Sequence, residues 1–247
     1  MPDFIQNIIQ SAAVQDNIRI FLDLQNGFLP GIWETLYSTI LATLFAYVIG
    51  LPLGVLLVTG EKDGVSPLPG WFMKILNIVV NLLRSVPFLI LMILVLPLSK
   101  LVLGTDIGTP ASIIPLVIAA FPFVARMVES SIREVDTGVI EAAQAMGASP
   151  FQIIRKVMIP EALPSLISGA TISLTTILGY GAMAGIIGGG GLGKIAINYG
   201  YNRFNYAVMI VAVILLIILV QIFQSIGTHL AVKCDKRLTQ ITKRSKK

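Results

Sequence analysis

The sequence has very few of the side chains that form crosslinks or metal sites. It contains one cysteine, Cys234, and one histidine, His229. One cysteine cannot form an internal disulfide, and no histidine, cysteine and acidic residues have the spacing of a metal site. Both residues lie at the predicted end of the last apolar stretch, where we interpret them as incidental. We expect no metal site and no cofactor in this chain.

Charged residues are scarce as well. They make up 13% of the 247 residues, whereas a soluble domain is nearer a quarter charged. Hydrophobic residues make up 55%, and the mean hydropathy is +0.85. A chain this apolar cannot cover a water-facing surface with polar groups, so its solvent is lipid.

Two kinds of catalytic residue set are also missing. The sequence shows no Ser-His-Asp combination and no pair of carboxylates within an apolar stretch, because Glu34 and Asp106 fall at predicted span ends. Ionisable groups inside the membrane would be the signature of a proton relay. The sequence therefore disfavours an intramembrane enzyme and a proton-coupled carrier, and we predict no catalytic residue.

Five apolar stretches are long enough to cross a bilayer, which takes about 20 helical residues. They cover residues 32–58, 71–96, 111–127, 165–187 and 206–232. We predict an all-α polytopic membrane protein with about five transmembrane helices. Its expected parts are an N-terminal segment (1–30), a transmembrane domain (31–232) and a basic tail (233–247).

Residues 1–30 are expected to lie outside the membrane or on its surface. They lack a basic start followed by a continuous apolar core, so we predict no cleavable signal peptide. Phe4, Ile8 and Ala12 recur at helical spacing. This pattern favours an amphipathic helix in the membrane interface.

Basic residues predict the orientation, because cytoplasmic loops of membrane proteins are enriched in lysine and arginine. With five spans and the N-terminus outside, 13 of the 18 basic residues fall on the inner side, seven of them in the tail. We predict a multi-pass membrane protein with a cytoplasmic C-terminus. Nucleic-acid binding is a poor alternative, since no aromatic residues interleave with the basic residues of the tail.

The segment between the third and fourth stretches, residues 128–164, is long, charged and patterned. Asp136 is typical of a helix start and Gly147 of a helix end. Residues 149–152 then form a capping box with proline at the first helical position, which opens a second helix. The apolar face predicted for this second helix consists of Phe151, Ile154 and Met158.

Two interpretations of this loop are open on its pattern alone. Glu129 and Arg133, four apart with the acid first, form a favourable pair on an extension of the third helix. The small side chains within residues 141–145 would let another protein approach closely. Alternatively, the loop is a local structure that covers its own helix ends.

The motif Glu141-Ala142-Ala143, followed by Gly147 and by prolines at 160 and 164, resembles the "EAA" loop of binding-protein-dependent ABC importer permeases. Within that family the chain is most similar to the methionine importer permeases, over residues 83–88, 122–129, 140–164 and 179–201. The resemblance covers roughly residues 30–235. Residues 1–30 look like an addition to the usual pattern.

The resemblance implies a transport subunit in a bacterial plasma membrane that does not hydrolyse ATP itself. Two copies would form the pathway, two ATP-binding-cassette subunits would bind ATP and Mg and dock on the cytoplasmic loop, and an extracytoplasmic binding protein would deliver the cargo. ATP binding would move the coupling helices and switch the pathway between its two openings. The residues it assigns to coupling are Glu141, Ala142, Ala143, Met146, Gly147, Ile159, Pro160 and Pro164.

The implied cargo is D- or L-methionine, or both. The same machine could carry another amino acid or an osmoprotectant, and no residue excludes this. An alternative from another class is a helical channel or scaffold without an ATPase. A channel has no need of a docking helix, so the loop disfavours it.

A glycine-rich run, residues 188–194, nearly matches a phosphate-binding loop. Such a loop needs a preceding strand, a following helix, and Ser or Thr after the lysine, where this chain has Ile195. The predicted topology also puts the run outside, away from cytoplasmic ATP. We therefore reject nucleotide binding and expect a tight turn or hinge.

Other glycines and polar residues lie within the predicted spans. Gly50 and Gly54, like Gly181 and Gly185, are four apart, which favours close helix packing over a pathway role. In the second span polar residues recur on one face, and they either line the inner mouth of a pathway or reach back to the interface. Hydroxyls in the fourth span could bond to the backbone or hydrate a pathway. The candidate pathway-lining residues are Asn77, Asn81, Arg84, Tyr180 and Met183.

Overall fold

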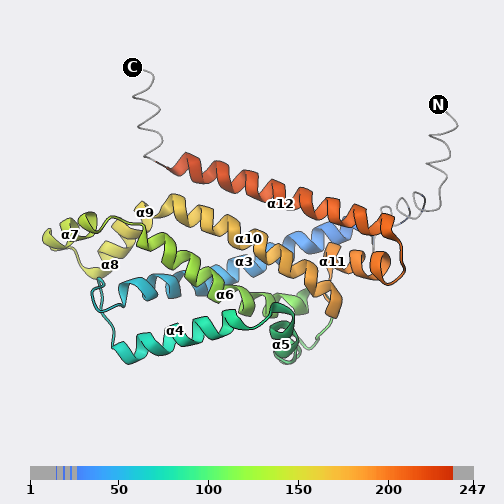
Figure 1. Ribbon diagram of the computed structural model, residues 1–247, viewed down its shortest axis with the longest axis horizontal. Helices are drawn as coiled ribbons and strands as arrows, with labels where there is room; N and C mark the ends of the chain where they lie inside the picture. Colours follow the sequence, from blue (N-terminus) through green and yellow to red (C-terminus); the bar gives the residue numbers. More distant parts are fainter. Residues whose placement is uncertain (1–14, 16–18, 20–22, 24–26, 236–247) are drawn as a thin grey trace, which may run out of the picture. The chain divides into compact units, whose positions relative to one another are not determined.

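The computed structural model describes residues 15, 19, 23 and 27–235 (Figure 1). The interfacial helix predicted within residues 1–30 lies almost wholly outside the described residues, and so does the tail beyond Asp235. Every regular element in the described part is helical. This confirms the predicted all-α fold class.

Ten α-helices make up most of the described chain. They are α3 (Phe28–Thr59), α4 (Gly70–Ser85), α5 (Phe88–Leu103), α6 (Thr109–Arg133), α7 (Thr137–Ala145), α8 (Pro150–Ile153), α9 (Ile159–Glu161), α10 (Leu163–Ala184), α11 (Gly191–Ile195) and α12 (Tyr206–Cys234). Three elements with other windings are the π-helices η1 (Ile154–Met158) and η3 (Ala196–Tyr201) and the 3-10 helix η2 (Gly185–Ile187).

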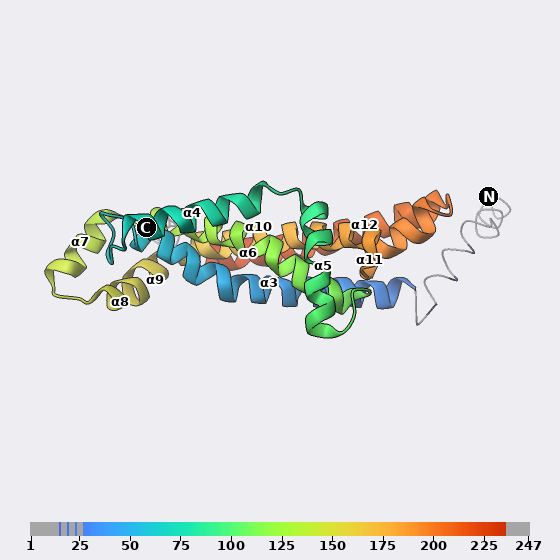
Figure 2. The same cartoon turned by 90° about the horizontal axis from the view of Figure 1, so that it is seen from below.

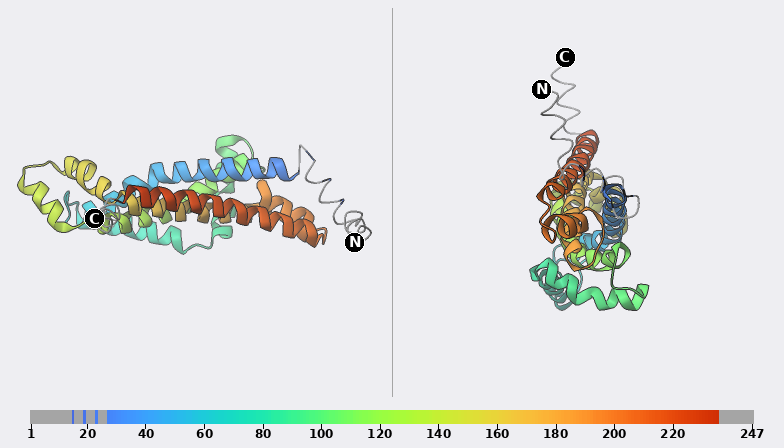
Figure 3. Two further views of the ribbon diagram at one scale, coloured as in Figure 1. Left: turned by 90° about the horizontal axis from the view of Figure 1, so that it is seen from above. Right: turned by 90° about the vertical axis from the view of Figure 1, so that its right-hand side faces the viewer.

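The apolar stretches predicted as spans form long helices. Among the described residues, four helical segments are long and apolar enough to cross a membrane: α3, α6, α10 with its continuation to Tyr201, and α12. The pair α4 and α5 passes the same test together, as a bent pair. The prediction of about five spans is therefore confirmed. Figure 3 shows α12 as one unbroken helix. Only 11% of its most apolar 18-residue stretch is buried within the chain.

The second span is not the single helix predicted over residues 71–96. It breaks at Val86 and Pro87, so that α4 ends at Ser85 and α5 begins at Phe88. Pro87 has no amide hydrogen, and its ring pushes the preceding residue into extended backbone, which Val86 adopts with ψ 129°. The sequence contained this signal, and reading the apolar run alone missed it.

The described residues fall into two compact units. The first contains residues up to Thr43, Pro87–Ile118 and Thr176–Ile222, and the second contains Leu44–Val86, Ala119–Thr175 and the chain from Phe223. In the first unit a core forms where α11 meets the start of α3 and the start of α12. Its buried members are Phe28, Leu192, Ile195, Val208 and Ala212.

In the second unit α3 packs closely on α6, as the paired glycines predicted. A side chain at Gly50 would lie 2.7 Å from Val124 Cγ1, and one at Gly54 would lie 2.6 Å from Val128 Cβ. Gly181, by contrast, has open space around it. Within the chain, the packing interpretation therefore holds for the first pair and for Gly185, whose Cβ would meet the backbone of Gly193 and Lys194, but not for Gly181.

Candidate functional site

The loop after α6 folds into two short helices, α7 and α8, which Figure 2 shows joined by a turn. The Asp136 side chain caps α7 by accepting a 2.7 Å hydrogen bond from the Gly138 amide. Aspartate is a preferred cap because its carboxylate accepts a hydrogen bond from an amide that the first helical turn leaves unpaired. The predicted helix start is confirmed.

The turn after α7 depends on Gly147. Its φ of +78° is left-handed, which glycine adopts without strain. The Gly147 amide donates to the Gln144 carbonyl at 2.9 Å, and the Ala148 amide donates to the Ala143 carbonyl at 3.1 Å. These bonds close the helix end as in a Schellman motif. The predicted capping box then opens α8, with Ser149 as its first partner.

The helix that follows α8 is α-helical only in part. Residues Ile154–Met158 form the π-helix η1, in which the backbone bonds five residues on rather than four. The buried residues are accordingly Ile153 (1% exposed) and Met158 (2%), which are five apart, while Phe151 is 68% exposed. Of the predicted apolar face, Met158 is buried and Ile154 is half-buried, but Phe151 is exposed and Ile153 takes its place, because the spacing assumed an unbroken α-helix.

Most of the residues assigned to coupling face outward. Glu141, Ala142, Gly147 and Pro160 are exposed, and Met146 is 81% exposed. Ile159 and Pro164 are half-buried. Ala143 is only 4% exposed and packs inward, so it anchors α7 and offers no surface to another protein. An exposed methionine beside small side chains makes a surface that another protein could cover.

A polar groove lies between α4 and α6. It has a volume of about 590 Å³, and its lining includes Asn77, Asn81 and Arg84 from α4. The Arg126 guanidinium donates to Asn77 Oδ1 at 2.8 Å and to Asn81 Oδ1 at 3.0 Å. Arg84 is exposed in the groove. The three candidates predicted on α4 thus share one face, and Arg126 is a groove residue that the sequence patterns did not reveal.

Arg126 belongs to a larger set of contacts that ends at the loop after α3. It donates to Glu129 at 2.5 Å, and Arg133 donates to Glu129 at 2.9 Å, which confirms the predicted pair. Arg133 also donates to both carboxylate oxygens of Glu61, at 2.7 and 3.0 Å. We call the set the polar network; it consists of Asn77, Asn81, Arg126, Glu129, Arg133 and Glu61.

Arg133 stabilises the ionised form of the Glu61 carboxylate. The hydrogen bonds from Arg133 lower the pKa of Glu61 below its ordinary value of 4.5, against a smaller opposing effect of burial. Glu61 and Arg133 are 72 positions apart in the sequence, so no local pattern could have paired them.

The remaining pathway candidates lie in the first unit. Tyr180 on α10 stacks on Phe88 of α5, with ring centroids 4.3 Å apart and planes 7° from parallel. Met183 is 46% exposed. Hydroxyls of α10 mostly bond back to the helix, as Thr171 does to the Ile167 carbonyl at 2.9 Å. For these hydroxyls the structure favours the backbone interpretation over a hydrated pathway.

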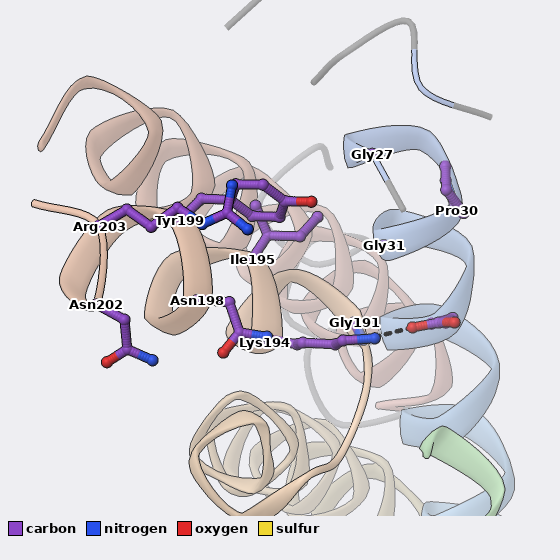
Figure 4. Close-up of a pocket in the computed structure, with 11 residues that line it drawn as sticks. Gly27, Pro30, Gly31, Gly191, Lys194, Ile195, Asn198, Tyr199, Asn202 and Arg203 are labelled. Carbon is purple, nitrogen blue, oxygen red and sulfur yellow. Dashed lines mark hydrogen bonds between the residues drawn. The ribbon is translucent and has the colours of Figure 1, made fainter. Parts of the chain in front are cut away.

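The glycine-rich run lies beside a pocket of about 330 Å³ (Figure 4). The Gly191 amide donates to the Glu34 carboxylate at 2.6 Å, and the Leu192 amide donates to the Thr35 hydroxyl at 2.9 Å. These amides open α11, where a phosphate-binding loop would hold its anion. A carboxylate already occupies that place and would repel phosphate, which supports rejecting a nucleotide site.

Several helices long and apolar enough to cross a bilayer, with a structured loop between the third and fourth of the predicted spans, define the class of multi-pass membrane proteins. The sequence profile of the binding-protein-dependent transport system inner membrane components matches residues 50–233. The chain belongs to that family, and the predicted resemblance is confirmed.

Individual relatives agree with this assignment. A probable D-methionine transport system permease protein MetI from Vibrio cholerae is 52% identical over 210 residues, covering 85% of this chain and 92% of that protein. Its counterpart from Pasteurella multocida is 44% identical over 217 residues, covering 84% and 99%. An inward-facing structure of the MetNI methionine ABC transporter matches with a TM-score of 0.82 at 44% identity, covering 84% of this chain and 96% of that one.

Proposed function

We propose that this chain is the permease subunit of an ABC importer for methionine, in the D form, the L form or both. Two copies form the translocation pathway, two ATPase subunits bind ATP and Mg, and an extracytoplasmic protein delivers the cargo. The observation that carries the proposal is the 52% identity to a probable D-methionine permease over 85% of this chain.

The ATPase subunits dock on α7 and the turn that follows it. Glu141, Ala142, Met146 and Gly147 supply the contact, and the buried Ala143 holds α7 to the permease. Small side chains beside a flexible, apolar methionine suit a helix that inserts into a groove of another protein. Capping at both ends keeps this nine-residue helix folded, since so short a helix is marginal on its own.

The chain is oriented with its N-terminus outside and its C-terminus in the cytoplasm. This places α7, Arg155 and Lys156 on the inner side, in keeping with the excess of basic residues there. A Cys234→Ser background allows a direct test by labelling single cysteines with a membrane-impermeant maleimide in intact cells. Thr105→Cys should react, and Lys62→Cys should react only after the cells are opened.

The polar face of α4 lines the inner mouth of the pathway. Polar side chains at membrane depth are stable only when they face protein or water. Asn77 and Asn81 are held by Arg126, and Arg84 is left to meet water or cargo. Tyr180 and Met183 are the corresponding candidates in the first unit.

Uptake of radiolabelled methionine tests the cargo. Cells that lack other methionine carriers are compared with and without this chain, at sub-micromolar substrate, with unlabelled D-methionine as competitor. Uptake should collapse without the chain and return on complementation. Unchanged uptake would refute the cargo, and co-purification in mild detergent would then show whether ATPase subunits accompany the chain, as they would not for a channel or scaffold.

A further inference from the structure

The polar network ends next to the proposed docking helix. Arg133 is the last residue of α6, and only Glu134 and Val135 separate it from Asp136, the cap of α7. Val135 is 6% exposed, and its amide donates to the Ile132 carbonyl at 3.3 Å. So short a connection with a buried residue cannot absorb a displacement of α7. Whatever moves α7 therefore moves the end of α6.

At its other end the network holds the loop after α3, which is itself tightly bonded. The Ser66 amide donates to the Thr59 carbonyl at 2.9 Å, and the Leu68 amide donates to the Gly60 carbonyl at 3.0 Å. Leu68 also packs against the core of the second unit. A force on Glu61 is therefore passed to the end of α3 and to the chain that leads into α4.

We propose that Arg133 is a positioning residue that makes α7, the end of α6 and the loop after α3 move as one body during transport. The proposal rests on the proposed function, because it supplies the step between ATPase docking and movement of α4. Asn77 and Asn81, held by Arg126, extend the same connection along the pathway face of α4.

The geometry of the Glu61–Arg133 pair suits the transmission of movement better than the stabilisation of the fold. Two carboxylates and two guanidiniums balance in charge, so the network needs no further ion. The Arg133 and Glu61 side chains are 44% and 47% exposed, and pairs exposed to this extent add little to folding stability. Their two parallel hydrogen bonds nevertheless fix both distance and orientation, which a lysine could not do. Loss of the pair should change movement more than folding.

The test removes each end of the pair in the complete transporter, reconstituted in liposomes with its ATPase subunits and binding protein. Glu61→Gln and Arg133→Gln should each raise the ATP hydrolysed per methionine imported by at least about threefold, while the ATPase subunits still co-purify. The double variant should be no worse than Arg133→Gln, because both changes break the Glu61–Arg133 contact and only Arg133→Gln also breaks the contact with Glu129. Arg133→Lys should recover only part of the loss.

Asp63→Asn is the matched control. Asp63 lies in the same loop, is exposed, and has no hydrogen bond or ion pair among the described residues. Its replacement should leave the ratio unchanged. An unchanged ratio in Glu61→Gln and Arg133→Gln, or an equal rise in Asp63→Asn, would overturn the proposal.

A second readout does not depend on the cargo or on docking. Spin labels at Lys62→Cys and Gln144→Cys, in a Cys234→Ser background, report the separation of the loop and α7. The separation should be narrowly distributed in the parent chain and broad with Arg133→Gln. Equal widths would refute the linkage, even if methionine proved to be the wrong cargo. A narrow parent distribution without methionine uptake would instead refute the proposed function alone.

Discussion

Substitutions at Gly147 test the backbone conformation of the turn after α7 separately from its side-chain contacts. A Cβ atom built there meets nothing within 4 Å, so the penalty of a side chain arises from the backbone alone. At φ +78° an ordinary L-residue is disfavoured by about 1–2 kcal/mol, which lowers the population of the turn roughly 5- to 30-fold. Gly147→Ala should therefore loosen the connection between α7 and α8 without any steric clash.

Two further substitutions separate the turn from the docking surface. Asparagine tolerates left-handed backbone, so Gly147→Asn should keep most of the activity. Gly147→Arg combines the backbone penalty of alanine with bulk and charge at an exposed position, and should uncouple ATP hydrolysis from uptake. The difference between the alanine and arginine variants then reports the docking surface alone.

The assay is methionine uptake together with ATPase rate, compared at equal amounts of protein in the membrane. We expect uptake to fall in the order glycine, asparagine, alanine, arginine. Equal uptake by the alanine and glycine forms would refute the role of the turn. Normal uptake by Gly147→Arg at wild-type membrane levels would refute the assignment of this loop to docking.

Four further outcomes follow from other contacts. Gly54→Ala should lower the melting temperature of the detergent-solubilised protein, because its Cβ would lie 2.6 Å from Val128 Cβ, while Gly181→Ala, in open space, should not. Tyr180→Phe should keep the stacked ring and normal uptake. Tyr180→Ala should reduce uptake, and it should lower the free energy of unfolding by at least about 0.5–1.5 kcal/mol. Met146→Glu should weaken co-purification of the ATPase subunits without changing the melting temperature, since Met146 is 81% exposed. Because Arg133 lowers the pKa of Glu61, the pair stabilises the fold above pH 4.5 and loses this effect as the pH falls through the lowered pKa. The melting temperature of the parent chain should therefore exceed that of Glu61→Gln slightly at pH 7, and the gap should close in acid.

Local signals in the sequence predicted the local structure well. Asp136, Gly147 and the capping box at Ser149 each depend on residues within four positions, and each formed as predicted. The spans could be predicted from the apolar runs, because a single segment in lipid can pair all of its backbone hydrogen-bonding groups only as a helix. The break at Pro87 was also predictable, since the residue before a proline avoids helical backbone.

Other features depend on contacts that no short pattern encodes. Ala142 and Ala143 are the same small residue at adjacent positions, so the sequence alone did not show that one is buried and the other exposed. The Glu61–Arg133 pair joins residues 72 apart. Which residues η1 buries depends on its π-helical winding, and no residue composition distinguishes a π-helix from an α-helix in the sequence.

The π-helix at Ile154–Met158 is also a place where chain length can vary. A π turn is an α-helical turn with one residue inserted, and it confines the resulting rotation to that turn. Removing one residue there would restore α-helical geometry and leave the faces of the helices on both sides unchanged. A gap of one residue at this point in an alignment would therefore mark a local change in winding, and the residues on either side would still correspond.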